Sequence, residues 1–158
     1  MKVSTVGKIL SETERAYIAG FLDGDGAIMG CIERHKEKRF GFRVRVLVKI
    51  TQTKKKDVVW LCNLTKLGYI RKNRRTFEWE LRDQKAVKWF LGMISPFTHT
   101  KKEQVKLGLK ILKSSGSSAK ELYQKARLAD TLSSFNVRSK KRRKNFAIMI
   151  KERVSRND

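Results

Sequence analysis

Two aspartates separated by a single glycine stand out in a chain with few acidic residues. Asp23 and Asp25 form the stretch Asp-Gly-Asp-Gly, directly after the apolar run AYIAGFL. Carboxylates this close together either hold a divalent cation or cap a turn through their own backbone. An EF-hand calcium loop is excluded, because it needs an oxygen ligand at Ala27 and a glutamate at Arg34. The spacing alone leaves a turn and a cation site both open.

The element that must position these aspartates is a helix. Ser11 and Glu14 have the S-x-x-E spacing of a capping box, which predicts a helix over about 12–22. Gly24 and Gly26 are expected to end it, since glycine readily adopts the conformations that helix ends require. Carboxylates are unfavourable at the negative end of a helix dipole unless a cation compensates. Their position therefore favours the cation site.

One side of this predicted helix is thin. Ala16, Ala19 and Gly20 have the smallest side chains and lie close together on a helical surface. Small residues let another helix approach closely. The second helix can belong to another molecule or to the same chain, and the sequence leaves both open.

Alternating side chains predict four strands. In residues 42–51 every second side chain is apolar, with Leu47 as an exception, and the other face is mostly basic. This period of two is typical of a half-buried antiparallel strand. Further strands are predicted at 27–35, 69–73 and 77–82, and further helices at 56–67, 83–94, 101–113, 119–135 and 145–154. The order α-ββ-α-ββ-α predicts an α+β fold, with helices on the apolar face of a curved four-stranded antiparallel sheet.

Length and composition restrict the class of protein. The 158 residues suffice for a single domain over 1–158, with its core at about 12–113 and C-terminal helices and a basic segment at 119–158. Lysine and arginine outnumber aspartate and glutamate by 38 to 15, for a formal net charge of +23. Such an excess repels itself, which favours a polyanionic partner: nucleic acid first, an anionic membrane surface second.

Two further features concern the cellular compartment. No apolar run approaches the ~18 residues of a membrane span, and no hydrophobic signal region is evident near Met1. Cys31 and Cys62 form no CxxC pair, as is typical of reduced cysteines in an intracellular protein.

The outward face of the predicted sheet is the expected nucleic-acid surface, because strands can lie in a major groove. Arginine there can bridge guanine edges and glutamate can accept from cytosine, whereas phosphate contacts only position the protein. The predicted contacts are Met29, Cys31, Glu33, His35, Arg43, Arg45, Lys49, Arg71, Asn73, Glu78, Glu80 and Arg82. A basic cluster at 138–144 is either a phosphate clamp or a tail; its contacts would be Arg138, Lys140, Lys141 and Arg142.

The stretch IAGFLDGDG, residues 18–26, resembles the motif of the LAGLIDADG homing endonucleases. Isoleucine replaces the leucine of its first position, and glycine stands between the aspartates. The αββαββα order over about 12–113 also matches this family. A single copy implies a homodimer whose motif helices pack on a two-fold axis through Ala16, Ala19, Gly20 and Asp23. Each subunit would then read half of a near-palindromic DNA site.

The resemblance also implies a mechanism. Asp25 is the expected metal ligand, assisted by the backbone carbonyl of Gly24, and Asp23 supports the turn. Related enzymes place a glutamine at the end of the second strand, a basic residue shortly after it and a lysine in a later loop. Gln52, Lys56 (with Lys55 as a neighbour that could substitute) and Lys101 are the matching positions. Gln52 would order the water network, and the lysines would stabilise phosphate charge.

The expected cofactor is Mg²⁺, two or three ions per dimer site, with Mn²⁺ able to substitute. The expected product has 3′ overhangs, and neither a membrane nor a small-molecule substrate is expected. The protein would be encoded in an intron or intein and act in an organelle or in an archaeal or bacterial cytoplasm. Two other functions remain open: an RNA-binding intron maturase on the same scaffold, and a DNA-binding regulator with a decayed site. The presence of Asp25, Gln52 and Lys101 argues against both.

Overall fold

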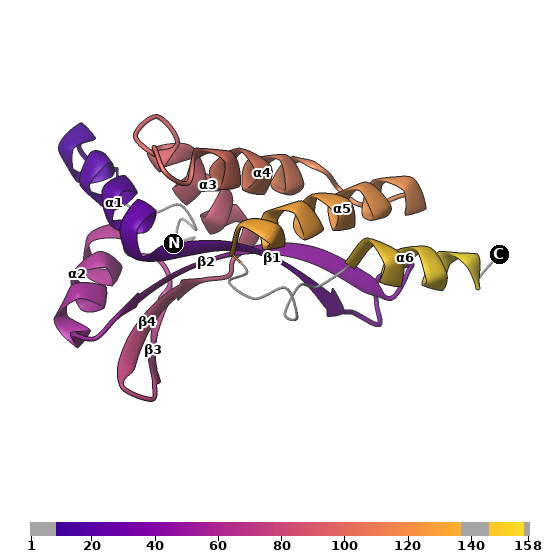
Figure 1. Ribbon diagram of the computed structural model, residues 1–158, viewed down its shortest axis with the longest axis horizontal. Helices are drawn as coiled ribbons and strands as arrows, with labels where there is room; N and C mark the ends of the chain where they lie inside the picture. Colours follow the sequence, from indigo (N-terminus) through magenta and orange to yellow (C-terminus); the bar gives the residue numbers. More distant parts are fainter. Residues whose placement is uncertain (1–8, 137–145, 157–158) are drawn as a thin grey trace, which may run out of the picture.

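The structure, a computed structural model, describes residues 9–136 and 146–156. Its elements follow the predicted α-ββ-α-ββ-α order, which confirms the α+β fold (Figure 1). They are α1 (Glu12–Asp25), β1 (Gly26–Arg34), β2 (Phe42–Gln52), α2 (Lys55–Thr65), β3 (Tyr69–Asn73), β4 (Thr76–Leu81), α3 (Gln84–Ile94), α4 (Lys102–Lys113), α5 (Ala119–Asn136) and α6 (Phe146–Ser155). The cluster at 138–144 lies outside the described residues.

The helix that carries the aspartates begins as predicted and ends later. The Ser11 side chain accepts from the Glu14 N–H, and the Glu14 side chain accepts from the Ser11 N–H, so the capping box is present. The expected end near Leu22 is wrong, because α1 continues through Gly24 to Asp25. Gly26 begins β1 with φ −97°, and a Cβ there would lie 2.7 Å from the Leu22 carbonyl oxygen. Gly26 is therefore needed for close approach, not for a left-handed turn.

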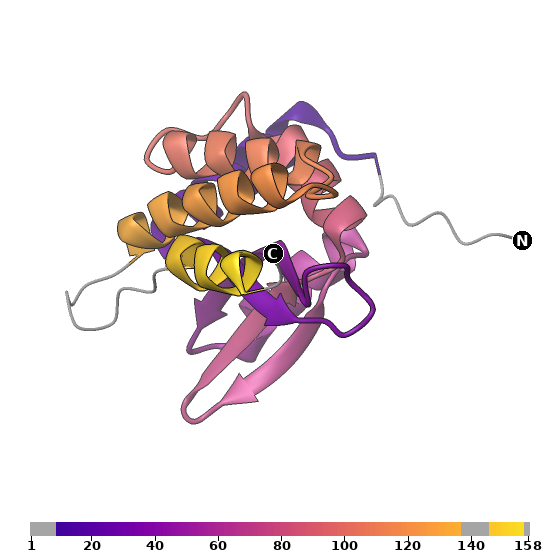
Figure 2. The ribbon, with the colours of Figure 1, turned by 90° about the vertical axis from the view of Figure 1, so that its right-hand side faces the viewer.

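The four strands form one antiparallel sheet in the order β1-β2-β4-β3. Helices α3, α4 and α5 cover one face of this sheet, and the β3–β4 hairpin extends away from them (Figure 2). The even-numbered positions of β2 from Val44 to Ile50 are buried beneath the helices, as the alternation predicts. The opposite face therefore carries the basic side chains.

The C-terminal helices belong to the same core. Gly30 of β1 lets α5 approach closely, since a Cβ there would lie 2.8 Å from the Cα of Ala129. Asp130 of α5 accepts hydrogen bonds from the backbone N–H groups of Phe146 and Ala147, and so caps α6. These contacts place α6 beside the far end of the β1–β2 hairpin (Figure 1). Among the described helices, none combines the length and apolarity that crossing a membrane requires.

Candidate active site and sheet surface

Asp25 and Gln52 lie together at one end of the sheet. Asp25 is the exposed last residue of α1, and Gln52 is the last residue of β2. Because β1 follows α1 directly and pairs Gly26 with Ile50, the end of β2 lies beside the end of α1. The Gln52 Nε2 atom donates to Oδ2 of Asp25 at 2.7 Å. This bond leaves Oδ1 of Asp25 available for another partner.

Asp23 holds the loop that carries Lys101. Its carboxylate accepts from the backbone N–H groups of His99, Thr100 and Lys101 at 2.7, 3.2 and 3.0 Å. The Lys101 ammonium in turn donates to the Asp23 carbonyl oxygen at 2.6 Å. Lys101 therefore supplies positive charge at the negative end of α1, as the dipole requires. These bonds favour a structural role for Asp23, as the sequence led us to expect.

We expect Asp23→Ala to lower the free energy of unfolding by about 2–4 kcal/mol, because three backbone N–H groups lose a charged acceptor that is only partly exposed. The measurement is urea denaturation at pH 7. Asp23→Asn keeps an acceptor oxygen and should lose less. Equal stability of Asp23→Ala and the unsubstituted protein would contradict the inferred role of Asp23.

The end of α1 offers oxygen donors suited to a divalent cation. The last carbonyls of a helix have no intrahelical donor, and that of Gly24 is one of them. Together with the exposed Asp25 carboxylate it matches the oxygen ligands that Mg²⁺ prefers. Within residues 9–136 and 146–156, no group of three or more His, Cys, Asp or Glu side chains could hold a metal.

Lys56 remains a prediction. It lies with Lys55 in the exposed first turn of α2, shortly after Gln52. Among the described residues, no hydrogen bond or ion pair joins either lysine to Asp25 or Gln52.

The exposed side of α1 differs from the predicted thin side. Ala16 and Gly20 are exposed, but Ala19 is 0% exposed in the core of its own subunit, so its expected place in a dimer interface is wrong. The Asp23 carboxylate is likewise directed to the loop at 99–101. Gly24 continues the stripe of Ala16 and Gly20, and an added Cβ at Gly20 or Gly24 would meet nothing within 4 Å.

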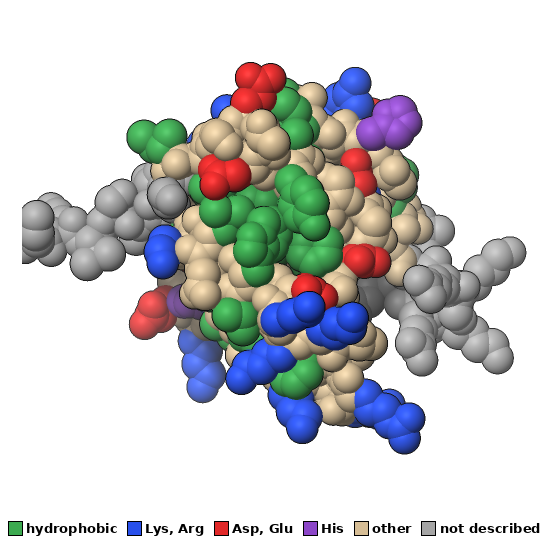
Figure 3. Space-filling model, turned by 90° about the vertical axis from the view of Figure 1, so that its left-hand side faces the viewer, with side chains coloured by type: hydrophobic (Ala, Val, Ile, Leu, Met, Phe, Trp, Pro, Cys, Tyr) green, Lys and Arg blue, Asp and Glu red, His purple; other side chains and the backbone are tan. Residues whose placement is uncertain are grey.

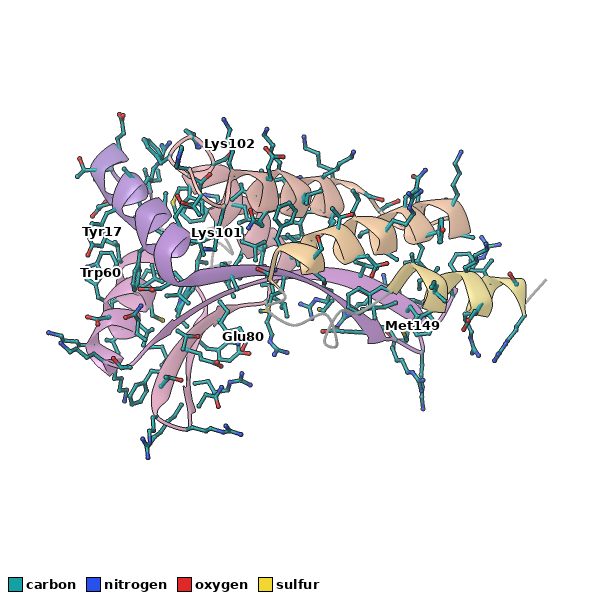
Figure 4. All side chains as sticks on the ribbon, viewed as in Figure 1. Tyr17, Trp60, Glu80, Lys101, Lys102 and Met149 are labelled. Carbon is teal, nitrogen blue, oxygen red and sulfur yellow. The ribbon has the colours of Figure 1, made fainter. Side chains whose placement is uncertain are left out.

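Three aromatic residues that were not predicted to be functional extend this exposed side onto α2. Tyr17 is 65% exposed and Trp60 39% exposed. Their side chains lie side by side (Figure 4), with ring centroids 5.2 Å apart. The Phe21 ring centroid lies 6.2 Å from that of Trp60. Figure 3 shows a hydrophobic patch at this end of the molecule, with acidic side chains at its rim. We call Ala16, Tyr17, Gly20, Phe21 and Trp60 the α1–α2 patch.

The sheet face opposite the helices carries paired charges. The Glu33 carboxylate lies 2.8 Å from Arg43 and 3.4 Å from Arg45. Glu78 lies 2.6 Å from Arg71 and 3.1 Å from Lys49, and Glu80 pairs with Arg82. The glutamates thus hold these cations in fixed directions on the face that was predicted to contact DNA.

Glu78 and Glu80 do not present open acceptors to DNA in this structure. Both are only 2% exposed and are paired with cations, so the expectation that they accept from cytosine is not met here. Met29 and Cys31 are half-buried on β1, and Asn73 donates to Glu78 at 3.0 Å. His35 lies beyond the end of β1, in the loop to β2. Arg43, Arg45, Lys49, Arg71 and Arg82 remain the predicted cationic contacts of this face.

The ion pairs of Glu78 with Arg71 and Lys49 make the free energy of unfolding depend on pH. Burial raises the pKa of Glu78, but hydrogen bonds from Asn73, Arg71 and Lys49 outweigh it and lower the pKa from 4.5 to about 2. A lowered folded-state pKa means that the ionised Glu78 stabilises the fold fully above the unfolded pKa, and that this contribution disappears as pH falls through the folded pKa.

We therefore expect Glu78→Gln to be less stable than the unsubstituted protein at pH 7, with the difference shrinking between pH 4.5 and about 2. Thermal or urea unfolding of both proteins across this range measures it. A difference that stays constant with pH would rule out the Glu78 charge as its cause.

Comparisons with known proteins match this arrangement. The LAGLIDADG endonuclease family profile matches residues 18–107. The DNA endonuclease I-CreI of Chlamydomonas reinhardtii is 30% identical over 100 residues, 61% of this chain and 60% of the relative. The chain thus matches about three-fifths of that curated relative's length.

Solved structures show the same fold. The homing endonuclease I-CvuI, bound to the I-CreI target in the presence of Mg with the DNA not cleaved, has a TM-score of 0.82 at 25% identity, over 92% of this chain and 94% of that one. The archaeal intron-encoded I-Vdi141I, complexed with DNA, has a TM-score of 0.77 at 17% identity, over 91% of this chain and 98% of that one. At this lower identity the second similarity concerns the fold alone.

Proposed function

The chain belongs to the LAGLIDADG endonuclease family, and we propose that it is a homodimeric, magnesium-dependent endonuclease that cuts one near-palindromic site in double-stranded DNA. The observation that carries this proposal is the exposed Asp25 carboxylate, held by Gln52 at 2.7 Å at the end of α1. Lys101 lies beside the same helix end, bound to the Asp23 carbonyl oxygen at 2.6 Å. An acid, an amide and a cation thus converge beside a basic sheet face.

The partner subunit completes this site. Among the described residues, Asp25 is the one exposed carboxylate at the C-terminal end of α1, so we infer that a second Asp25 comes from another copy, across the α1–α2 patch. Exposed aromatic residues around a stripe of small residues favour close helix packing, since the small residues let backbones approach and the aromatics supply apolar area. A two-fold axis through this patch would place the two Asp25 carboxylates near each other.

DNA would lie along the sheet face opposite the helices. Arg43, Arg45, Lys49, Arg71 and Arg82 lie there on β2, β3 and just after β4, already oriented by Glu33, Glu78 and Glu80. Orienting a guanidinium before binding reduces the side-chain entropy lost on contact with a base or phosphate. Two such faces related by a two-fold axis imply a site with two similar halves.

The residues at the α1 end have separable tasks in hydrolysis. The Asp25 carboxylate and the Gly24 carbonyl would hold Mg²⁺, which supplies Lewis-acid stabilisation and a more acidic water when bound. Gln52 fixes the orientation of the Asp25 carboxylate through its bond to Oδ2. Lys101, fixed by the Asp23 carbonyl oxygen, offers its remaining ammonium protons to the negative charge that develops on the phosphate.

The experiment is incubation of the protein with a randomised duplex library and Mg²⁺, followed by sequencing of the cut ends. The proposal expects one near-palindromic cut site with 3′ overhangs and no cutting in EDTA. Tight binding to a structured intron RNA, without cleavage of any duplex, would instead support the maturase function.

A further inference from the structure

A basic hollow lies at the end of the sheet far from Asp25. It has a volume of about 600 Å³ and lies between the β1–β2 loop and α6. Six lysine and arginine residues line it, with Glu152 as the single acid: Arg34, Lys36, Lys38, Arg39, Arg153 and Arg156. Met149 of α6 adds an apolar wall (Figure 4).

The charges of this hollow differ from those of the sheet face. The sheet cations are paired with Glu33, Glu78 and Glu80. In the part of the chain that the structure describes, none of the six hollow cations lies within 4.0 Å of an acidic side chain. Unpaired like charges around a concavity repel each other and attract an anion.

The hollow is formed by an ordered loop. Backbone hydrogen bonds join His35 N–H to the Gly41 carbonyl at 2.9 Å, Lys38 N–H to the His35 carbonyl at 3.0 Å, and Gly41 N–H to the Lys38 carbonyl at 2.8 Å. Gly41 has φ +73°, a conformation that favours glycine. The Arg39 guanidinium lies 5.3 Å from the centre of the Phe40 ring. The cations are thus presented by a defined backbone.

His35, in the loop that forms the hollow, carries a buried nitrogen that is unpaired within the described part of the chain. Its Nδ1 atom is buried and has no hydrogen-bond partner among the described residues. A buried polar atom of this kind costs free energy unless a water or a ligand binds it. His35 is one of the residues that line the hollow.

We propose that this hollow binds a backbone phosphate of the DNA in the outer flank of each half-site, an inference that rests on the proposed function. Along β1, Gly26 and Arg34 lie roughly 26 Å apart, at about 3.3 Å per residue. At ~3.4 Å per base pair, that places the hollow about eight base pairs from the cleavage centre. Guanidinium and ammonium groups match phosphate oxygens and donate without reading a base, so this contact adds affinity rather than sequence preference.

The test compares Arg153→Gln/Arg156→Gln with a charge-matched control, Lys110→Gln/Lys113→Gln, on the exposed side of α4. The probes are two duplexes that carry the site recovered by binding from the same randomised library in Ca²⁺, so that no cleavage is needed to define it. One, of about 30 base pairs, reaches both hollows of a dimer, and one, of about 14, ends before them. The α6 variant should bind the long duplex about tenfold or more weakly, with a log–log salt dependence shallower by about 2.

Binding of the short duplex, and cleavage at saturating protein, should stay unchanged in the α6 variant. Equal losses on both duplexes, or equal losses in the α4 control, would overturn the hollow's assignment. Cleavage by the unsubstituted protein reports separately on the proposed function. If that protein binds the duplex but never cuts it, the endonuclease proposal fails while the hollow is still tested; if it binds no duplex, both fail.

Discussion

Asp25→Asn is expected to reduce DNA cleavage by about a thousandfold or more, equivalent to about 4 kcal/mol in activation free energy. Asparagine keeps an oxygen that can accept from Gln52, so the local fold should persist. It lacks the negative charge that Mg²⁺ needs, and a dimer loses two such charges at its centre. Duplex binding should be unchanged or slightly tighter, because negative charge beside the phosphates has been removed.

The measurement is single-turnover cleavage of the selected duplex in Mg²⁺, with binding followed separately in Ca²⁺. Asp83→Asn is the matched control, since Asp83 caps α3 by accepting from the Ala86 N–H and asparagine caps helices equally well. Cleavage retained in Asp25→Asn, or lost to the same extent in Asp83→Asn, would refute the metal-ligand role of Asp25.

The sequence predicted the elements well because their signals are local. The Ser11–Glu14 box placed the start of α1, Asp83 capped α3 as expected, and the alternation in 42–51 identified the two faces of β2. The ends of the helices were predicted less accurately, because they depend on tertiary contacts. α1 passes Gly24, where its end is held by Asp23 and the loop at 99–101. α2 ends early at Thr65, with Lys66 in a left-handed conformation.

In the candidate site, too, local signals were predictable and features that depend on tertiary packing were not. Its central residues were identified by resemblance to a motif, and the structure brings Asp25, Gln52 and Lys101 to one helix end. Which side of α1 faces outward could not be read from residue size, because Ala19 and Gly20 are both small and only packing decides which is buried. Similarly, alternation placed Glu78 and Glu80 on the basic face, but their burial depends on cations from β2, β3 and the end of β4.

Gly20→Gln is expected to abolish dimer formation and to reduce cleavage by at least about a hundredfold, while leaving the subunit folded. An added side chain at Gly20 meets nothing within 4 Å in the subunit, and glutamine favours a helix over glycine by about 0.5–1 kcal/mol. The subunit should thus be equally or more stable. The same side chain would hold apart two α1 helices that must approach closely across the α1–α2 patch, and the two Asp25 carboxylates would no longer meet.

Sedimentation should show a species of 18.4 kDa for Gly20→Gln and of twice that mass for the unsubstituted protein. Gly92→Gln provides the control, because Gly92 is also an exposed helical glycine with open space around it, but on α3. It should remain dimeric and active. A dimeric, active Gly20→Gln protein would show that the subunits do not meet along α1, and the second carboxylate of the site would then have to come from elsewhere. Because the proposed site needs the Asp25 carboxylates of both subunits, loss of the dimer and loss of cleavage should occur together.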